Sequence, residues 1–570
     1  MHLFPRRSSP QSTLVGSPTS TTSTSPLREK TSSTLTPKPS QMNLARPPEF
    51  EVIFSPMDRE NPKEWPFWYR IWSILTVSFA AWVVVLYSTS YSASIPGMME
   101  EFESTKSVTS LGMTTYLLGL AVGSFFAAPL SELFGRRLVY LVCLIMWALC
   151  IIPCALATSF SVIFTFRFIG ALFGAALISN GPGTVVDLSK PEYLAMGMSL
   201  FSIGPFNGPV LGPLVGGFVF EQHGWRWTNW VVLILAAVSF AMIFSVQETY
   251  APEILKRRAA KMRKESGDSR WWCQYDKTIE QRASQWKNIR TNLARPVVLF
   301  FTEPIVWFIN LWNALIYGIL YLCFVAYPLV FSVERQWSPG MSGMAYMGIG
   351  VGIMIAIAAE PLIRRFIQSQ PRDPLTGRPY PEAAAIVMAL GSILTPLGQM
   401  GFAWTCLPTN IHWIVPISFG IPFGMGNTLS FIYSSNYLAG SYGIYAASAL
   451  ASNAIIRSIF GATLPVAGAQ LYKTMSPQWA GTLCGMLAIA MMPIPFVFWR
   501  YGAKIRGRSK VIRQLREDAA RLEQRMNEER VKAAEFSSSE GQLTISSSLS
   551  SRYPSKPPSI GPLRLPSETV

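Results

Sequence analysis

The sequence predicts an all-α integral membrane protein, and two observations carry that prediction. Half of the 570 residues are hydrophobic and only 14% are charged, although soluble domains carry about a quarter charged residues. The charges also cluster between long apolar segments, such as 138–157 and 231–246. A helix of about 20 apolar residues crosses the hydrocarbon core of a bilayer. One such segment could form the core of a soluble domain, but their repetition along the chain favours a membrane protein.

Twelve of these segments can be placed as transmembrane helices, which satisfy every backbone polar group internally. Six precede a long polar segment and six follow it, so we expect two six-helix halves. The predicted spans are 69–95, 109–131, 138–158, 160–183, 193–220, 228–247, 299–327, 341–363, 383–405, 411–434, 443–471 and 477–500.

The segments outside the spans are polar. We expect a disordered N-terminal tail at 1–60, because its first 48 residues are rich in Ser, Thr and Pro and lack the hydrophobic region of a signal peptide. The two halves are placed at 61–247 and 297–504, with a basic cytoplasmic loop at 248–296 between them. Residues 505–570 are predicted to form a charged helix, at about 505–535, followed by a second disordered tail.

The distribution of Lys and Arg, which gives the chain a net charge of +16, predicts its orientation. If the N-terminus is cytoplasmic, the inner segments hold most of the positive residues, including clusters at 136–137 and 256–264. The outer loops then hold only Lys106, Arg226, Arg335 and Lys473. This asymmetry follows the positive-inside rule. We therefore expect both termini in the cytoplasm, and the charge requires no nucleic-acid partner. As separate expectations, the protein is a monomer and its membrane is the plasma membrane.

The sequence offers little of what metal sites and active sites require. Seven cysteines are dispersed without a C-x-x-C pair, and the three histidines are far apart, so we expect neither a metal site nor a cofactor. No nucleotide-binding G-x-x-x-x-G-K-[ST] pattern is present, which disfavours an ATP-driven pump. Transport without enzyme activity is the preferred interpretation, and a membrane enzyme or a non-transporting sensor are the alternatives.

The loop between the second and third spans has the sequence PLSELFGRR at 129–137. Gly135 permits a tight turn. Arg136 and Arg137 would face the anionic inner leaflet and could bind neighbouring helix ends, and Glu132 adds an acid to the same loop. An ordinary positive-inside loop is the alternative interpretation.

The fifth span carries the sequence GPVLGPLVGG at 208–217. Its small residues are four apart and allow helix backbones to pack closely, and Pro213 loosens the helix where a bend is useful. The small residues are Gly208, Gly212, Gly216 and the adjoining Gly217. Simple helix packing would explain this segment as well.

Arg167 stands within the fourth span, ahead of Gly170 and Gly174. An arginine inside a span is costly, so it usually faces protein or water and has a function. Arg167 also lies close enough to the predicted outer end to reach the surface by snorkelling.

These features together resemble the major facilitator superfamily, whose transporters have six plus six helices around a basic central loop. The 129–137 loop is similar to that family's G-x-L-(small)-D-(R/K)-x-G-(R/K)-(R/K) signature, with Ala128 and Leu133 as departures. The 208–217 segment matches G-x-x-x-G-P-x-x-G-G, the signature of the antiporter branch, without departure. Arg167 and Gly170 are similar to the family's R-x-x-Q-G-x-x motif, with Gly170 in place of Gln.

Further segments resemble the fungal drug:proton antiporter-1 family, and this resemblance covers about 61–505. They are NPKEW at 61–65, GWRWTNW at 224–230, ETYAPEIL at 248–255 and YAASA at 445–449. The resemblance implies a secondary transporter that exports an amphiphilic drug, toxin or secondary metabolite by proton antiport. Uptake or export of a specific metabolite, such as a polyamine or an organic acid, is the alternative. Gly440 stands where many relatives have Asp.

In such transporters the substrate binds near the midplane, between the two halves. The site candidates are therefore polar and aromatic residues deep in the spans: Asn180, Asn310, Asn313, Tyr317, Asn427, Asn453 and Arg457. For each asparagine, interhelical hydrogen bonding is an equal alternative to lining a cavity. Arg457 lies near the middle of its span, so we expect it to have a function.

Proton coupling requires an acid whose pKa burial can raise, and no midplane carboxylate stands out. Four acids lie near predicted inner ends, namely Glu132, Asp187, Glu303 and Glu360. Proton antiport is therefore implied by the resemblance and not by these residues.

Overall fold

The computed structural model describes residues 50–55, 58–190, 193–276, 296–372, 379–443 and 446–514, with residues 517, 521 and 524. The helices described below belong to the unit Glu51–Val570. Most of the predicted disordered tail at 1–60 lies outside the described residues, as do the second predicted tail at 536–570 and most of the predicted charged helix at 505–535; residues 50–55 and 58–60 of the first tail are described.

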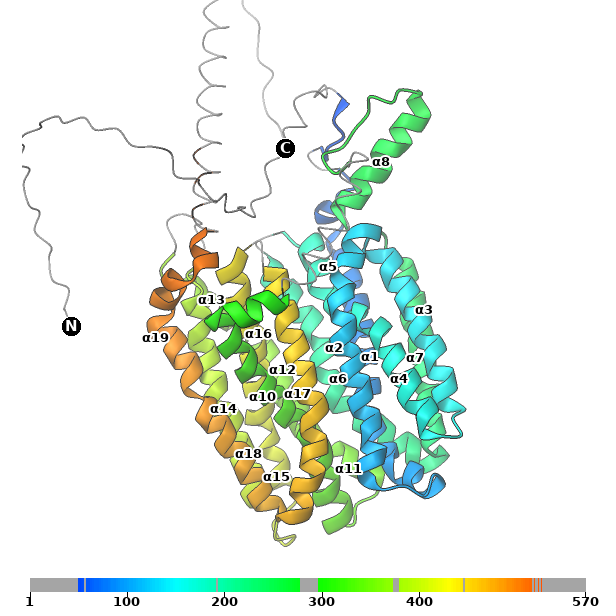
Figure 1. The fold of residues 1–570 in the computed structure, drawn as a ribbon, viewed down its shortest axis with the longest axis vertical. Coiled ribbons are helices and arrows are strands. Elements are labelled where there is room, and N and C mark those ends of the chain that lie inside the picture. The colour runs from blue at the N-terminus through cyan, green and yellow to red at the C-terminus, as the bar shows by residue number, and fades with distance from the viewer. Residues whose placement is uncertain are drawn as a thin grey trace, which may run out of the picture. The chain divides into compact units, whose positions relative to one another are not determined.

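The first half of the chain forms six membrane-length helical segments in its described part (Figure 1). The fourth segment consists of two helices that meet at Asn180. The elements are η2 (Pro62–Glu64), α1 (Phe67–Glu101), α2 (Lys106–Phe134), α3 (Arg136–Ala155), α4 (Phe160–Ser179), α5 (Gly181–Leu188), α6 (Leu194–His223) and α7 (Trp225–Ser245).

After α8 (Ala251–Ser266), the described part of the second half forms six more such segments, several of them divided into two helices. α10 continues directly into a π-helical turn, which is labelled η4. The elements are α10 (Pro304–Pro328), η4 (Leu329–Glu334), α11 (Pro339–Met344), α12 (Met347–Ala358), α13 (Glu360–Gln368), α14 (Glu382–Thr405), α15 (Ile414–Ser418), α16 (Gly420–Tyr442), α17 (Ala446–Thr474), α18 (Pro477–Met491) and α19 (Pro493–Arg508).

Local sequence explains where several helices begin and end. Gly135 (φ 87°) separates α2 from α3, and Gly224 (φ 81°) separates α6 from α7. Both glycines have positive φ, which a residue with a side chain adopts only under strain. α2 begins after Thr105, whose side chain accepts a hydrogen bond from the N–H of Val108 and so caps the helix.

The twelve membrane-length segments of the described residues confirm the predicted number of spans and their division into six and six. The observed helices differ from the predicted spans mainly in where they begin and end. The first segment is Phe67–Glu101, which is 35 residues long, and the tenth ends at Tyr442, whereas the sequence predicted 69–95 and 411–434. Hydropathy marks the edge of the hydrocarbon, while helical hydrogen bonding continues beyond it into polar residues.

Each half is held together by helix pairs distant in sequence. In the first half α1 packs against α6, and α2 against α4; in the second half α10 packs against α17, and α14 against α16. The halves meet where α2 packs on α17 and where α6 packs on α11 and α12.

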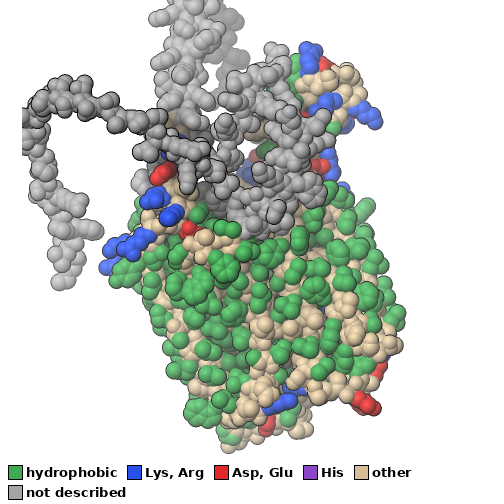
Figure 2. All heavy atoms as spheres, in the orientation of Figure 1, with side chains coloured by type: hydrophobic (Ala, Val, Ile, Leu, Met, Phe, Trp, Pro, Cys, Tyr) green, Lys and Arg blue, Asp and Glu red, His purple; other side chains and the backbone are tan. Residues whose placement is uncertain are grey.

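The sides of the helix bundle are apolar. Leu149, Ile234 and Phe244 are each more than half exposed, and Figure 2 shows hydrophobic side chains over the side of the bundle with charged side chains near its ends. Large apolar surfaces are rare on soluble monomers, so this belt is expected to contact the hydrocarbon of the bilayer.

The two ends of the bundle differ in charge. We call one of them the basic end: it carries α5 and α13 and is uppermost in Figure 1. Its arginines include Arg136, Arg137, Arg364, Arg365 and Arg506. The other, called the opposite end, carries α11 and α15.

The central segment, which the sequence predicted only as a basic loop, contains a folded part. Val52, Leu255, Ala259 and Cys273 form a small separate core, and the N–H of Val52 donates to the carbonyl of Trp272 (2.8 Å). Burial raises the pKa of the Cys273 thiol, so this cysteine acts as an apolar packing group.

Candidate functional site

Arg457 is held by aromatic side chains of the second half. It lies near the middle of α17, and its guanidinium carbon is 4.7 Å from the ring centre of Tyr317 on α10 and 4.4 Å from that of Phe431 on α16. The Nε atom is buried without a hydrogen-bond partner. The guanidinium is therefore held between two aromatic faces by cation–π contacts.

Aromatic and hydroxyl groups extend this cluster into the first half. The Tyr317 hydroxyl donates to that of Tyr321 (3.3 Å), which lies 3.0 Å from the Ser88 hydroxyl on α1. Phe431 packs edge-to-face on Phe206 of α6, with ring centres 5.0 Å apart. Residues from α1, α6, α10, α16 and α17 thus converge at mid-height between the halves.

Three predicted site asparagines bind neighbouring helices of the second half. Asn310 donates to Ser452 (2.8 Å) and accepts from Asn453 (3.0 Å), which joins α10 to α17. Asn313 donates to Ser434 (2.5 Å), which joins α10 to α16. All three are buried, so their contacts favour interhelical bonding over the lining of a cavity.

The other two asparagines differ in position. Asn427 lies one turn before Phe431 on α16, and its Nδ2 is buried without a partner. Asn180 lies at the junction of α4 and α5, where its Oδ1 accepts a hydrogen bond from Ser131 (3.2 Å). The structure therefore brings Asn180 into a network at the basic end and not into the cluster around Arg457.

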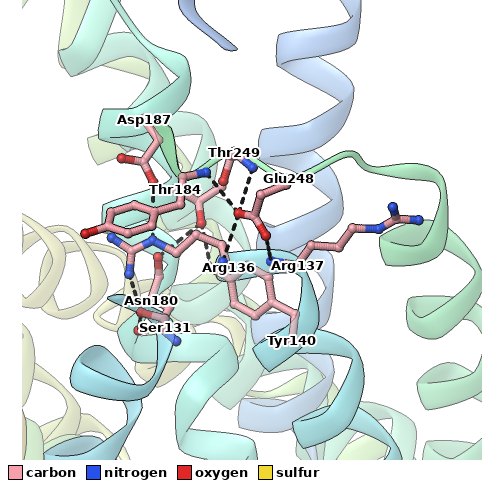
Figure 3. A network of polar contacts seen from close by, with 10 residues as sticks. Ser131, Arg136, Arg137, Tyr140, Asn180, Thr184, Asp187, Glu248 and Thr249 are labelled. Atoms are coloured by element: carbon pink, nitrogen blue, oxygen red, sulfur yellow. Dashed lines mark hydrogen bonds and ion pairs between the residues drawn. The ribbon is translucent and has the colours of Figure 1, made fainter. Parts of the chain in front are cut away.

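Arg136 is the centre of that network (Figure 3). Its Nε donates to Asp187 on α5 (3.2 Å), and its Nη1 donates to Ser131 on α2. Its guanidinium also lies 5.1 Å from the ring centre of Tyr250, whose pKa burial raises to about 12. Tyr250 therefore presents a neutral ring to the arginine.

Glu248 caps the start of α3 in the same network. One carboxylate oxygen accepts the N–H of Arg136 (2.9 Å), and the other accepts the N–H of Arg137 (3.1 Å). The anion thus meets the positive end of the helix dipole. A Cβ at Gly135 would lie 2.5 Å from a Glu248 oxygen, so a side chain here would displace this carboxylate, and the positive φ also favours glycine.

The acidic partners of this network lie outside the 129–137 loop. Glu132 is exposed and forms no hydrogen bond or ion pair with the described residues. Asp187 and Glu248 take that place instead. Their distance along the chain hides the pairing, although the ETYAPEIL segment marked Glu248 as a notable residue.

Arg167 is buried at 2% exposure, so it does not reach the surface as the snorkelling alternative supposed. Its Nε donates to the carbonyl of Gly112 (2.8 Å), and Nη2 donates to that of Tyr87 (3.3 Å). The rings of Tyr87, Tyr91 and Tyr116 surround its guanidinium at 4.3–4.9 Å. Arg167 therefore joins α4 to α1 and α2 within the first half.

The glycine motif of α6 packs on helices from both halves. A Cβ added at Gly208, Gly212 or Gly216 would strike α1, at Val85, Thr89 and Ser90 respectively. A Cβ at Gly217 would strike the Pro339 carbonyl of α11, and one at Gly343 would lie 2.6 Å from the Pro213 carbonyl. Close backbone contact thus joins α6 to its own half and to the other.

The acids near the basic end lie away from Arg457. Glu303 is buried and accepts hydrogen bonds from Tyr442 (3.1 Å) and Ser509 (2.7 Å). Glu360 is buried beside Arg364, 3.7 Å away, and burial raises the pKa of its carboxyl. No group of His, Cys, Asp and Glu in the described residues could hold a metal ion.

These features define a class: a helical membrane protein of two halves, with a charged aromatic cluster between them. The profile described as Major Facilitator Superfamily matches residues 77–465. The chain belongs to this superfamily, and it is a transporter rather than an enzyme.

Individual proteins agree with that assignment. The efflux pump FUBT of Fusarium oxysporum is 36% identical over 461 residues, which cover 80% of this chain and 77% of that protein. The major facilitator superfamily multidrug transporter mdrA of Aspergillus fumigatus is 36% identical over 463 residues, or 80% and 75% of the two chains. The xylose transporter XylE of E. coli, in a partially occluded inward open conformation, is similar in fold, with a TM-score of 0.52 and 16% identity over 76% of this chain and 97% of that chain.

Proposed function

We propose that this protein exports an amphiphilic drug, toxin or secondary metabolite by secondary active transport. The observation that carries the proposal is its 36% identity, over 80% of its length, to proteins named as an efflux pump and a multidrug transporter. The antiporter signature at 208–217 agrees with this direction of transport.

The contacts between the halves support a carrier that alternates between two conformations. Among the described residues, hydrogen bonds between the halves lie at mid-height and toward the opposite end. They are Ser88–Tyr321, Thr114–Ala462, Asn207–Met354 and Glu221–Gly340. We infer that the opposite end is closed in this conformation and that these contacts separate when substrate is released there.

The same proposal includes the orientation in the membrane, the oligomeric state, the membrane itself and the coupling ion. The basic end faces the cytoplasm, because it collects arginines, so both termini are cytoplasmic. The protein acts as a monomer in the plasma membrane, and protons moving inward drive export.

Comparison of cells with and without the protein tests export. Cells that express it should retain less of its substrates from a panel of amphiphilic compounds, and Arg457→Ala should abolish the difference at unchanged surface abundance. Lys473→Ala is the matched control, because Lys473 is an exposed cation at the end of the same helix. Equal retention in both cell types would contradict export, and greater retention with the protein would indicate uptake.

A further inference from the structure

We infer that the site at Arg457 binds the carboxylate of an acidic aromatic substrate, an inference that rests on the proposed export function. Arg457 is a cation within a membrane span, where charge is costly unless it is paired or faces water. No described carboxylate forms an ion pair with it, and the titratable groups that act on it are Tyr317 and Tyr321. No described protein group therefore supplies a full counter-charge to this cation.

The position of the guanidinium suits that role. The Nε atom is buried, but Arg457 as a whole is only half-buried. Its terminal nitrogens form no hydrogen bond with the described residues. Two adjacent N–H donors of a guanidinium match the two oxygens of a carboxylate, and such charge-assisted pairs are among the strongest hydrogen bonds in proteins.

Arg167 provides an internal comparison. It is also an arginine within a span, but two backbone carbonyls and three tyrosine rings surround it, and it is almost fully buried. Arg457 has aromatic neighbours and no carbonyl partner among the described residues. The two arginines therefore differ in the property that matters for a ligand, which is unused hydrogen-bonding capacity.

The surroundings of Arg457 indicate the rest of the ligand. Tyr317, Phe431 and Phe206 provide aromatic surfaces from both halves. Rings of this kind favour a planar apolar body through burial and edge or offset stacking. An ammonium group in the same place would meet the guanidinium without an intervening anion, so the site disfavours organic cations.

Three probes with one aromatic body and different charge test the inference: naphthoate, naphthamide and naphthylmethylammonium. Binding of labelled naphthoate to the purified full-length protein in lipid nanodiscs is measured at about pH 7, where the carboxyl is ionised. We expect naphthamide to compete at least about tenfold more weakly than unlabelled naphthoate, and the ammonium compound not to compete. Equal competition by all three, or no binding of labelled naphthoate, would overturn the assignment.

Variants of Arg457 identify the group responsible. Arg457→Gln should weaken naphthoate binding about tenfold or more, Arg457→Lys should lose less because it keeps a point charge, and Lys473→Gln should bind like the wild type. Unchanged binding by a folded Arg457→Gln protein would overturn the inference. If this variant does not fold, the competition series on the wild type decides alone.

Retention of the same probes in cells separates this inference from the proposed function. Export of naphthoate supports both. Export of naphthamide or the ammonium compound without naphthoate leaves export standing and contradicts the carboxylate site. If cells with and without the protein retain the whole amphiphilic panel equally, export itself fails, whatever the purified protein binds.

Discussion

At the scale of single residues, the sequence located the charged groups but not their partners. Arg457 was expected to have a function because of its depth in a span, and this stays a prediction; the structure shows its guanidinium between two aromatic rings. The hydrogen-bond partners of Arg167 could not be predicted, because Gly112 and Tyr87 belong to other helices. Polar spacing on one helix cannot show which neighbour completes a hydrogen bond.

The burial of the Glu360 carboxyl can be tested through the pH dependence of the protein's stability. Burial raises the pKa of its carboxyl above the ordinary 4.5, and the nearby Arg364 only partly opposes this. A group with a raised pKa in the folded state binds its proton more tightly there, so stability is lost as pH rises above the ordinary value. Glu360→Gln should therefore unfold at a higher temperature than the wild type near neutral pH.

Thermal unfolding across a pH series measures this effect. The difference between Glu360→Gln and the wild type should shrink as the pH falls and vanish below 4.5, where the wild-type carboxyl becomes protonated in both states. Tyr433 on α16 is the other titratable group that interacts with Glu360, so Tyr433→Phe serves as a control that leaves the carboxyl in place. A stability difference that does not change with pH would contradict this interpretation.

At the scale of elements, hydropathy and glycine patterns predicted the twelve spans and the close packing of α6. The divisions within spans were not predicted, such as the junction of α4 and α5 at Asn180, because a short break barely alters the average hydropathy. The cap that Glu248 places on α3 was also missed. It depends on two segments more than 100 residues apart in sequence, which only tertiary structure brings together.

Gly212 tests the packing of α6 on α1. An added methyl group would strike the Thr89 hydroxyl and lie 2.9 Å from the Leu86 carbonyl. We expect Gly212→Ala to lower the stability of the protein by about 1–3 kcal/mol, a typical cost of overpacking. Thermal unfolding of the purified variant measures this change.

Gly507 is the matched control, because it is also helical and an added Cβ there meets nothing within 4 Å. Gly507→Ala should be neutral or slightly stabilising, since alanine is the better helix former. Equal stabilities of the two variants would show that α6 and α1 are not in close backbone contact.

At the scale of the whole molecule, the six-plus-six division could be predicted because each span carries its own hydrophobic signal. The conformational state could not, since it depends on contacts between halves that share no local pattern. Thr114 on α2 donates to the carbonyl of Ala462 on α17 (2.8 Å), and this contact must open if the halves alternate.

A cysteine pair at these two positions tests alternation. Thr114→Cys with Ala462→Cys should cross-link under mild oxidation, stop export, and recover after reduction. Background reaction should be low, because all seven native cysteines lie in the described residues and are buried. Full export by the cross-linked protein would show that the opposite end does not open.

Transport into sealed inside-out membrane vesicles tests the central claim most directly. Vesicles with and without the protein receive a cell extract, and a proton gradient is imposed with the vesicle interior acidic. The compounds that accumulate inside are identified by mass spectrometry. We predict that a set of amphiphilic compounds accumulates only with the protein, that a protonophore abolishes this accumulation, and that Arg457→Ala vesicles lack it. Identical contents in vesicles with and without the protein would contradict secondary export.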